Sequence, residues 1–153
     1  RVQLYAELGS ALGAAGQLAS DCHDIFQARH SRDLAHGART LPIALHLEAL
    51  SGHKRRDFLR LLDQAPKDVA ARSHVRHTLI QSGRLRHCAF LVEVYCQKAL
   101  SCLRRADPLP QGRQSIVSII QRLSFFGGKN EKLKTRKNRC WNSFACCKHL
   151  QWM

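Results

Sequence analysis

Apolar side chains recur every three or four residues through most of the chain, which is the spacing of one face of an α-helix. This pattern predicts a long helix over Val2 to about Ala28, and the most regular example predicts a helix over Leu85 to Ala106. No segment alternates apolar and polar positions as a half-buried β-strand does. We therefore predict an all-α protein built as a helical bundle.

Turn residues divide the remaining sequence into shorter predicted helices. Thr40 is expected to cap the first of them, because its hydroxyl can accept an N–H and Pro42 lies in the first turn, where its missing N–H costs nothing. Residues 29–39 have mixed charge and no periodicity, so we expect a loop there. The shorter predicted helices are Thr40 to Gly52, Lys54 to Gln64, Asp68 to Gly83 and Gln114 to Phe126.

Three glycines interrupt the first predicted helix, at Gly9, Gly13 and Gly16. Each lowers helix stability by roughly 1 kcal/mol relative to alanine. Such a cost suggests that a neighbouring helix or a ligand approaches closely at these positions.

The character of the sequence changes after Phe126. We expect residues 1–126 to form the helical domain and residues 127–153 to be a basic tail that is disordered, read out of frame or an interaction arm. Three cysteines and a histidine of the tail do not match the spacing of a common zinc finger, so no zinc site is predicted there. These residues are Cys140, Cys146, Cys147 and His149.

The formal net charge of +14 suggests nucleic acid, an anionic membrane surface or a phosphorylated substrate as partner. The helical part has no basic stripe with interleaved aromatics, so we expect no nucleic-acid partner. The 7 cysteines lack the spacing of a disulfide framework, which favours reduced thiols in the cytoplasm. No apolar run approaches the roughly 18 residues of a membrane-spanning helix.

Two carboxylates give the first predicted helix its candidate chemistry. Gln17, Asp21 and Asp24 stand at i, i+4 and i+7 and therefore share a face. An acidic pair of this kind usually faces solvent without a function. The residues that follow it change that expectation.

The order of elements resembles the second aspartate-rich region of the trans-isoprenyl diphosphate synthases, the polyprenyl synthetase family, and the loop that follows it. The similarity covers most of Leu8 to Leu123 and implies the C-terminal part of an isoprenoid-synthase-type helical bundle. The matching residues are Gly13, Gln17, Leu18, Asp21 and Asp24 in the first block and Asp33, Leu34, Gly37, Thr40, Leu41 and Pro42 in the second.

The resemblance implies a prenyltransferase that condenses isopentenyl diphosphate with an allylic diphosphate. Asp21 and Asp24 would hold Mg²⁺, Gln17 would support the cation or the diphosphate, and Arg39 and Thr40 would bind substrate. It also implies a homodimer or heterodimer and peripheral membrane contact through the product. Because the chain starts at Arg1 without a first aspartate-rich region, we expect a fragment that is inactive alone.

Departures from the family pattern favour two alternatives. Ser20 replaces the first aspartate, Gly16 a phenylalanine and Ala38 the lysine before Thr-Leu-Pro. The first alternative is therefore a non-catalytic subunit, or a peptide-modifying prenyltransferase, of the same fold. The second is a basic helical module that binds nucleic acid or a membrane through the tail.

Overall fold

The computed structural model describes residues 1–27 and 30–125, and within them it contains seven α-helices and no strand. The prediction of an all-α fold is confirmed. The helices are α1 (Val2–Phe26), α2 (Arg32–Ala35), α3 (Leu41–Ala49), α4 (Gly52–Gln64), α5 (Val69–Gln81), α6 (Arg84–Ala106) and α7 (Pro110–Leu123).

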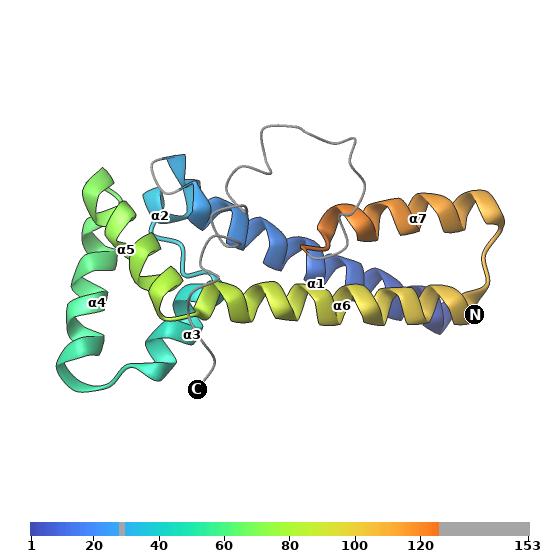
Figure 1. The fold of residues 1–153 in the computed structure, drawn as a ribbon, viewed down its shortest axis with the longest axis horizontal. Helices are drawn as coiled ribbons and strands as arrows, with labels where there is room; N and C mark the ends of the chain where they lie inside the picture. Colours follow the sequence, from blue (N-terminus) through green and yellow to red (C-terminus); the bar gives the residue numbers. More distant parts are fainter. Residues whose placement is uncertain (28–29, 126–153) are drawn as a thin grey trace, which may run out of the picture.

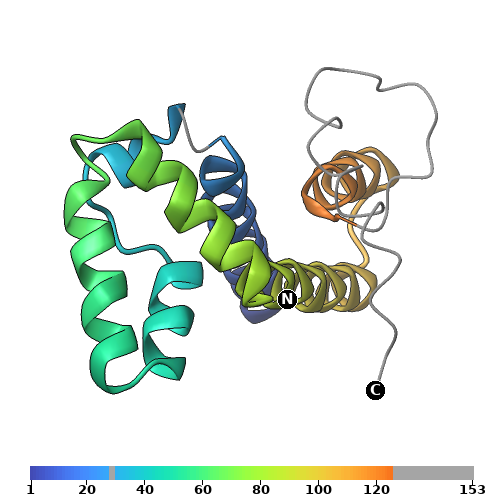
Figure 2. The same ribbon diagram turned by 60° about the vertical axis from the view of Figure 1, so that its left-hand side comes forward.

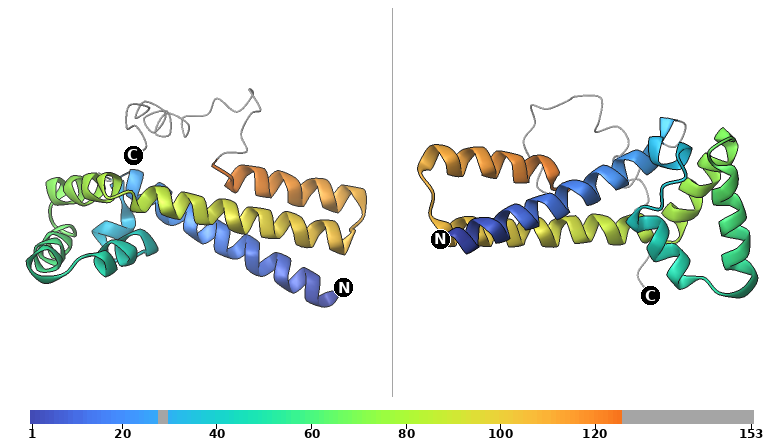
Figure 3. Two further views of the ribbon diagram at one scale, coloured as in Figure 1. Left: turned by 60° about the horizontal axis from the view of Figure 1, so that its bottom comes forward. Right: turned by 180° about the vertical axis from the view of Figure 1, so that it is seen from behind.

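The two longest helices, α1 and α6, lie side by side and make the most extensive helix contact of the fold. After α6 the chain reverses, and α7 runs back along the pair (Figure 1; Figure 3, left). Helices α3, α4 and α5 gather at the end of α6 opposite the α6–α7 turn, and Figure 2 shows them well away from α7. The molecule thus has a long three-helix part and a short-helix end, joined through α1 and α6.

The core follows this division and forms two clusters. Small side chains fill the contact of α1 with α6 in the three-helix part, and larger aliphatic and aromatic side chains fill the short-helix end. The first cluster is Leu8, Ala11, Ala15, Ala19, Val92, Cys96, Ala99, Cys102, Leu103 and Ile120. The second is Cys22, Ile25, Phe26, Leu34, Ile43, Leu47, Phe58, Leu62, Ala65, Val75, Leu79, Leu85 and Cys88.

Polar side chains satisfy the free backbone groups at several helix ends. Asp68 caps α5 as predicted, because its carboxylate accepts the N–H of Ala70 at 2.8 Å. Arg55 donates to the carbonyl of Leu47 near the end of α3. Arg72 donates to the carbonyl of Ala65 at 3.0 Å, where α4 ends. Cationic donors at the C-terminal ends of helices also interact favourably with the helix dipole.

Several predicted boundaries were wrong, including those of the last helix, which runs from Pro110 to Leu123 and not from Gln114 to Phe126. The predicted loop 29–39 contains the short helix α2, which Ser31 caps by accepting the N–H of Leu34. Gly52 does not end α3, which stops at Ala49 because Leu50 is extended. Gly52 instead begins α4, at a φ of +54° that favours glycine.

No described residue makes the close approach predicted at the glycines of α1, and the approach of a ligand stays a prediction. A Cβ atom added at Gly9, Gly13 or Gly16 would meet no neighbouring atom within 4 Å in the described structure. The helix therefore carries the intrinsic cost of these glycines without a packing reason from the described residues.

None of the helices in the described part of the chain is both long and apolar enough to span a bilayer. The predictions for residues 127–153, including the rejected zinc site at Cys140, Cys146, Cys147 and His149, lie outside the described residues.

We predict that Gly13→Ala raises the free energy of unfolding by about 0.5–1 kcal/mol, because alanine restrains the unfolded chain and Gly13 has open space around it. Urea denaturation followed by circular dichroism measures the change. The control is Ala14→Gly on the same helix, which should lower the stability by a similar amount. Destabilisation by Gly13→Ala would reveal a steric demand at this position.

Candidate functional site

The predicted site residues of α1 are divided between two environments. Asp21 is buried, with 7% of its surface exposed, and accepts a hydrogen bond from Gln17 Nε2 at 2.7 Å. Gln17 itself is exposed. The shared face predicted for these two residues is therefore present, and their amide–carboxylate contact spans one helical turn.

Asp24 faces the segment that follows α1 and is held there by several donors. Its Oδ1 accepts the N–H of Arg32 at 3.1 Å, and its Oδ2 accepts the N–H of Asp33 at 3.2 Å. The hydroxyl of Ser31 also donates to Oδ2. A carboxylate at free N–H groups of a helix start is favourable for both hydrogen bonding and the helix dipole. Asp24 thus ties the start of α2 to α1.

Asp33 completes a group of three acids in this region. Burial raises the pKa of the Asp33 carboxyl, and the neighbouring Asp24 and Asp21 raise it further. Like charges disfavour ionisation of the next acid in the group. Arg32 and His36 act in the opposite direction, but burial and the two other acids outweigh them.

These side chains do not fit a magnesium ion as they are arranged. Mg²⁺ requires nearly octahedral oxygen ligands, whereas both Asp24 oxygens accept bonds from Ser31 and two backbone amides. Ser20 is exposed and offers a neutral oxygen. In residues 1–27 and 30–125, no three His, Cys, Asp or Glu side chains form a metal-binding group. The magnesium site therefore stays a prediction.

The predicted substrate-binding residues lie after α2. Arg39 is exposed and borders a hollow of about 170 Å³, which Asp63, Leu34, Leu62 and Pro66 also line. Thr40 precedes α3 at the N-cap position, but its side chain makes no capping bond. The Thr40 Oγ1 is buried and lacks a hydrogen-bond partner in the described structure. Neither Asp21 nor Asp24 lines this hollow.

A second polar junction, which the sequence did not predict, fixes the end of α7. Glu93 on α6 accepts the hydroxyl of Ser124 at 2.9 Å and the N–H of Phe125 at 2.6 Å. The Phe125 ring meets the ring of His23 edge-on, with centroids 5.8 Å apart. Residues from α1, α6 and the end of α7 therefore meet at His23, which lies between Asp21 and Asp24 in the sequence.

Two buried thiols lie behind the acidic group, where α1 meets α6. The Cys22 thiol donates a hydrogen bond to the Cys88 sulfur, and this bond, together with burial, raises the pKa of Cys22, while the same bond lowers that of Cys88. Both cysteines are free and fully buried. Their place in the core agrees with a packing role.

No protein-family model, curated protein or solved structure matches the chain. The resemblance to the polyprenyl synthetase family therefore stays a prediction. It rests on the two sequence blocks described above.

We predict that Asp24→Ala lowers the free energy of unfolding by about 2–3 kcal/mol. The substitution removes the acceptor of three donors, one of which belongs to the buried Ser31. Chemical denaturation provides the measurement. Ser20→Ala is the matched control on an exposed position of α1 and should change stability by less than about 0.5 kcal/mol. An Asp24→Ala protein as stable as the control would contradict the structural role of Asp24.

We predict that Asp33→Asn stabilises the protein at neutral pH and has no stabilising effect below the ordinary aspartate pKa of 3.8. Since the Asp33 pKa is raised on folding, the native protein binds the proton more tightly, and the aspartate loses stability as the pH rises through this range. The substitution keeps the backbone N–H that Asp24 accepts. Unfolding measured at pH 3 and pH 7 gives the comparison, and an equal effect at both values would contradict it.

Proposed function

We propose that this chain contributes to a trans-prenyltransferase, the class of enzyme that joins isopentenyl diphosphate to an allylic diphosphate. In that reaction the allylic C–O bond breaks, the alkene of isopentenyl diphosphate forms the new C–C bond, and a proton leaves the product. The released diphosphate can accept this proton, so the protein need not supply a general base.

The observation that supports the proposal is the contact of Asp24 with Ser31, Arg32 and Asp33. Asp24 belongs to the first of the two sequence blocks that resemble the family, and Asp33 belongs to the second. These blocks form one hydrogen-bonded unit at the end of α1. A motif that works through both blocks requires this adjacency.

Within this proposal the residues have separate roles. Gln17 orients the buried Asp21 carboxylate. The negative charge of this carboxylate would stabilise the allylic cation that forms when the C–O bond breaks. Arg39 is exposed and offsets phosphate charge from the loop before α3. Asp24 positions that loop through α2. Arg39 is the residue whose loss should weaken the binding of a diphosphate directly, whereas Asp21 does not line the hollow beside Arg39.

A second candidate function is a non-catalytic subunit of the same fold that supports a catalytic partner. The observation that favours it is again at Asp24, whose two oxygens are occupied by protein donors. Ser20 adds no charge beside it. A subunit of this type would keep the fold of the acidic region and lose the reaction.

We predict that the purified chain, given labelled isopentenyl diphosphate, geranyl diphosphate and Mg²⁺, retains the allylic diphosphate in equilibrium dialysis and makes no longer product. The described residues contain only this one acidic region on α1 and α2, which cannot hold a diphosphate from two sides. Arg39→Ala should weaken retention about tenfold, the effect expected for one charged contact of about 1.4 kcal/mol.

Arg104→Ala is the control, because Arg104 is an exposed arginine at the other end of α6. Clear elongation would overturn the prediction of inactivity. A chain that binds neither diphosphate would overturn the leading proposal and favour the non-catalytic subunit.

A further inference from the structure

The positive charge of the described helices is concentrated at the short-helix end. Residues 52–87 contain 9 Lys and Arg against 3 Asp and Glu, whereas residues 1–51 contain 4 against 5 and residues 88–125 contain 5 against 2. The segment 52–87 comprises α4, α5 and the beginning of α6. Its net charge of +6, from 9 minus 3, is therefore carried by one end of the molecule (Figures 1 and 2).

Some of these cations serve the fold and others do not. Arg55 and Arg72 donate to backbone carbonyls at helix ends. Four others are exposed on α4 and the turn after it, and we call them the α4 basic face: Lys54, Arg56, Arg60 and Lys67.

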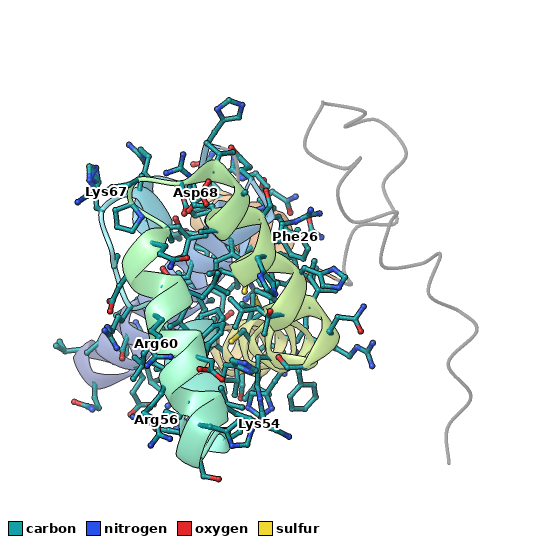
Figure 4. The ribbon with its side chains drawn as sticks, turned by 90° about the vertical axis from the view of Figure 1, so that its left-hand side faces the viewer. Phe26, Lys54, Arg56, Arg60, Lys67 and Asp68 are labelled. Carbon is teal, nitrogen blue, oxygen red and sulfur yellow. The ribbon has the colours of Figure 1, made fainter. Side chains whose placement is uncertain are left out.

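The α4 basic face has little internal compensation. Arg60 approaches Asp57 at 3.5 Å, but both side chains are largely exposed, and pairs of this kind contribute little. Lys54, Arg56 and Lys67 form no ion pair with any described residue. Figure 4 shows α4 at the front of this end, with Arg56, Arg60 and Lys67 along one side and Lys54 on the other. Three of the four cations thus lie exposed along one side of α4 and the turn after it, with Asp57 and Asp63 as exposed acids on the same helix.

We propose that the α4 basic face docks the protein on an anionic phospholipid surface. Four lysines and arginines on one amphipathic helix and its adjoining turn are sufficient for electrostatic attachment to acidic headgroups. The apolar side of α4 is anchored in the core through Phe58 and Leu62, so α4 would lie on the headgroups as part of the folded protein. Val69, which is 45% exposed next to Asp68, adds an apolar contact at the edge of the face.

The composition of the face favours a lipid surface over nucleic acid. Asp57 and Asp63 are exposed among its cations. Zwitterionic headgroups mixed with acidic ones can accommodate both signs of charge, whereas a nucleic-acid backbone presents phosphates alone. The aromatic side chain of α4, Phe58, is buried and unavailable for stacking on bases. Docking uses none of the residues assigned to diphosphate binding, so it stands independently of the proposed function.

The test is co-sedimentation of the full chain with vesicles of phosphatidylcholine alone and of phosphatidylcholine mixed with phosphatidylserine. We expect binding to the mixed vesicles only, and loss of binding when salt rises from about 0.1 M to 1 M. A variant carrying Lys54→Gln, Arg56→Gln, Arg60→Gln and Lys67→Gln should bind at least tenfold more weakly, because each such charge near an acidic membrane contributes up to about fivefold.

The control variant carries Lys98→Gln, Arg104→Gln, Arg105→Gln and Arg122→Gln, which remove the same net charge from exposed positions of α6 and α7. It should bind nearly as the parent does, and circular dichroism checks that both variants fold. Equal loss in both variants, or no loss in the first, would overturn the proposal. Tighter binding to duplex or single-stranded RNA than to the mixed vesicles, lost in the first variant, would also overturn it and identify a nucleic-acid face.

Discussion

The close packing of α1 against α6 is the constraint on which the other elements depend. Small side chains allow it, since Ala11, Ala15 and Ala19 on α1 face Ala99 and Cys102 in the same buried cluster. Every other helix packs on this pair or on a helix that does. A large side chain at one of these alanines would push α1 and α6 apart. Because both helices contribute to both core clusters, the packing of each cluster would loosen.

Long periodic stretches were predictable from the sequence, and short local contacts were not. The buried positions of α6 follow its apolar stripe, and Asp68 caps α5 as its position suggested. The helix α2 was missed because four residues carry no periodicity and a single Ser31 signals its start. The cost of the glycines of α1 suggested the close approach of a helix or a ligand, and the space around them could be judged only with the neighbouring residues in place.

The candidate site illustrates the same limit. The shared face of Gln17 and Asp21 follows from helix geometry and is present. The partners of Asp24 lie seven to nine residues further along the chain, and their contact depends on how the chain reverses after α1. The family resemblance implied a metal ligand at Asp24, whereas the fold uses the same carboxylate to accept hydrogen bonds at the start of α2. A carboxylate can bind a metal or cap a helix. Which of the two it does depends on the donors that the fold places within hydrogen-bond distance of it.

The division of the core into two clusters determines which helix can unfold locally without the others. Only α1 and α6 belong to both clusters, and α7 contributes Ile120 as its one fully buried side chain among the described residues. Local unfolding occurs most easily in elements with little buried apolar surface. Backbone amides of α7 should therefore exchange with solvent deuterium well before those in the middle of α6, through detachment of α7 that leaves the short-helix end intact.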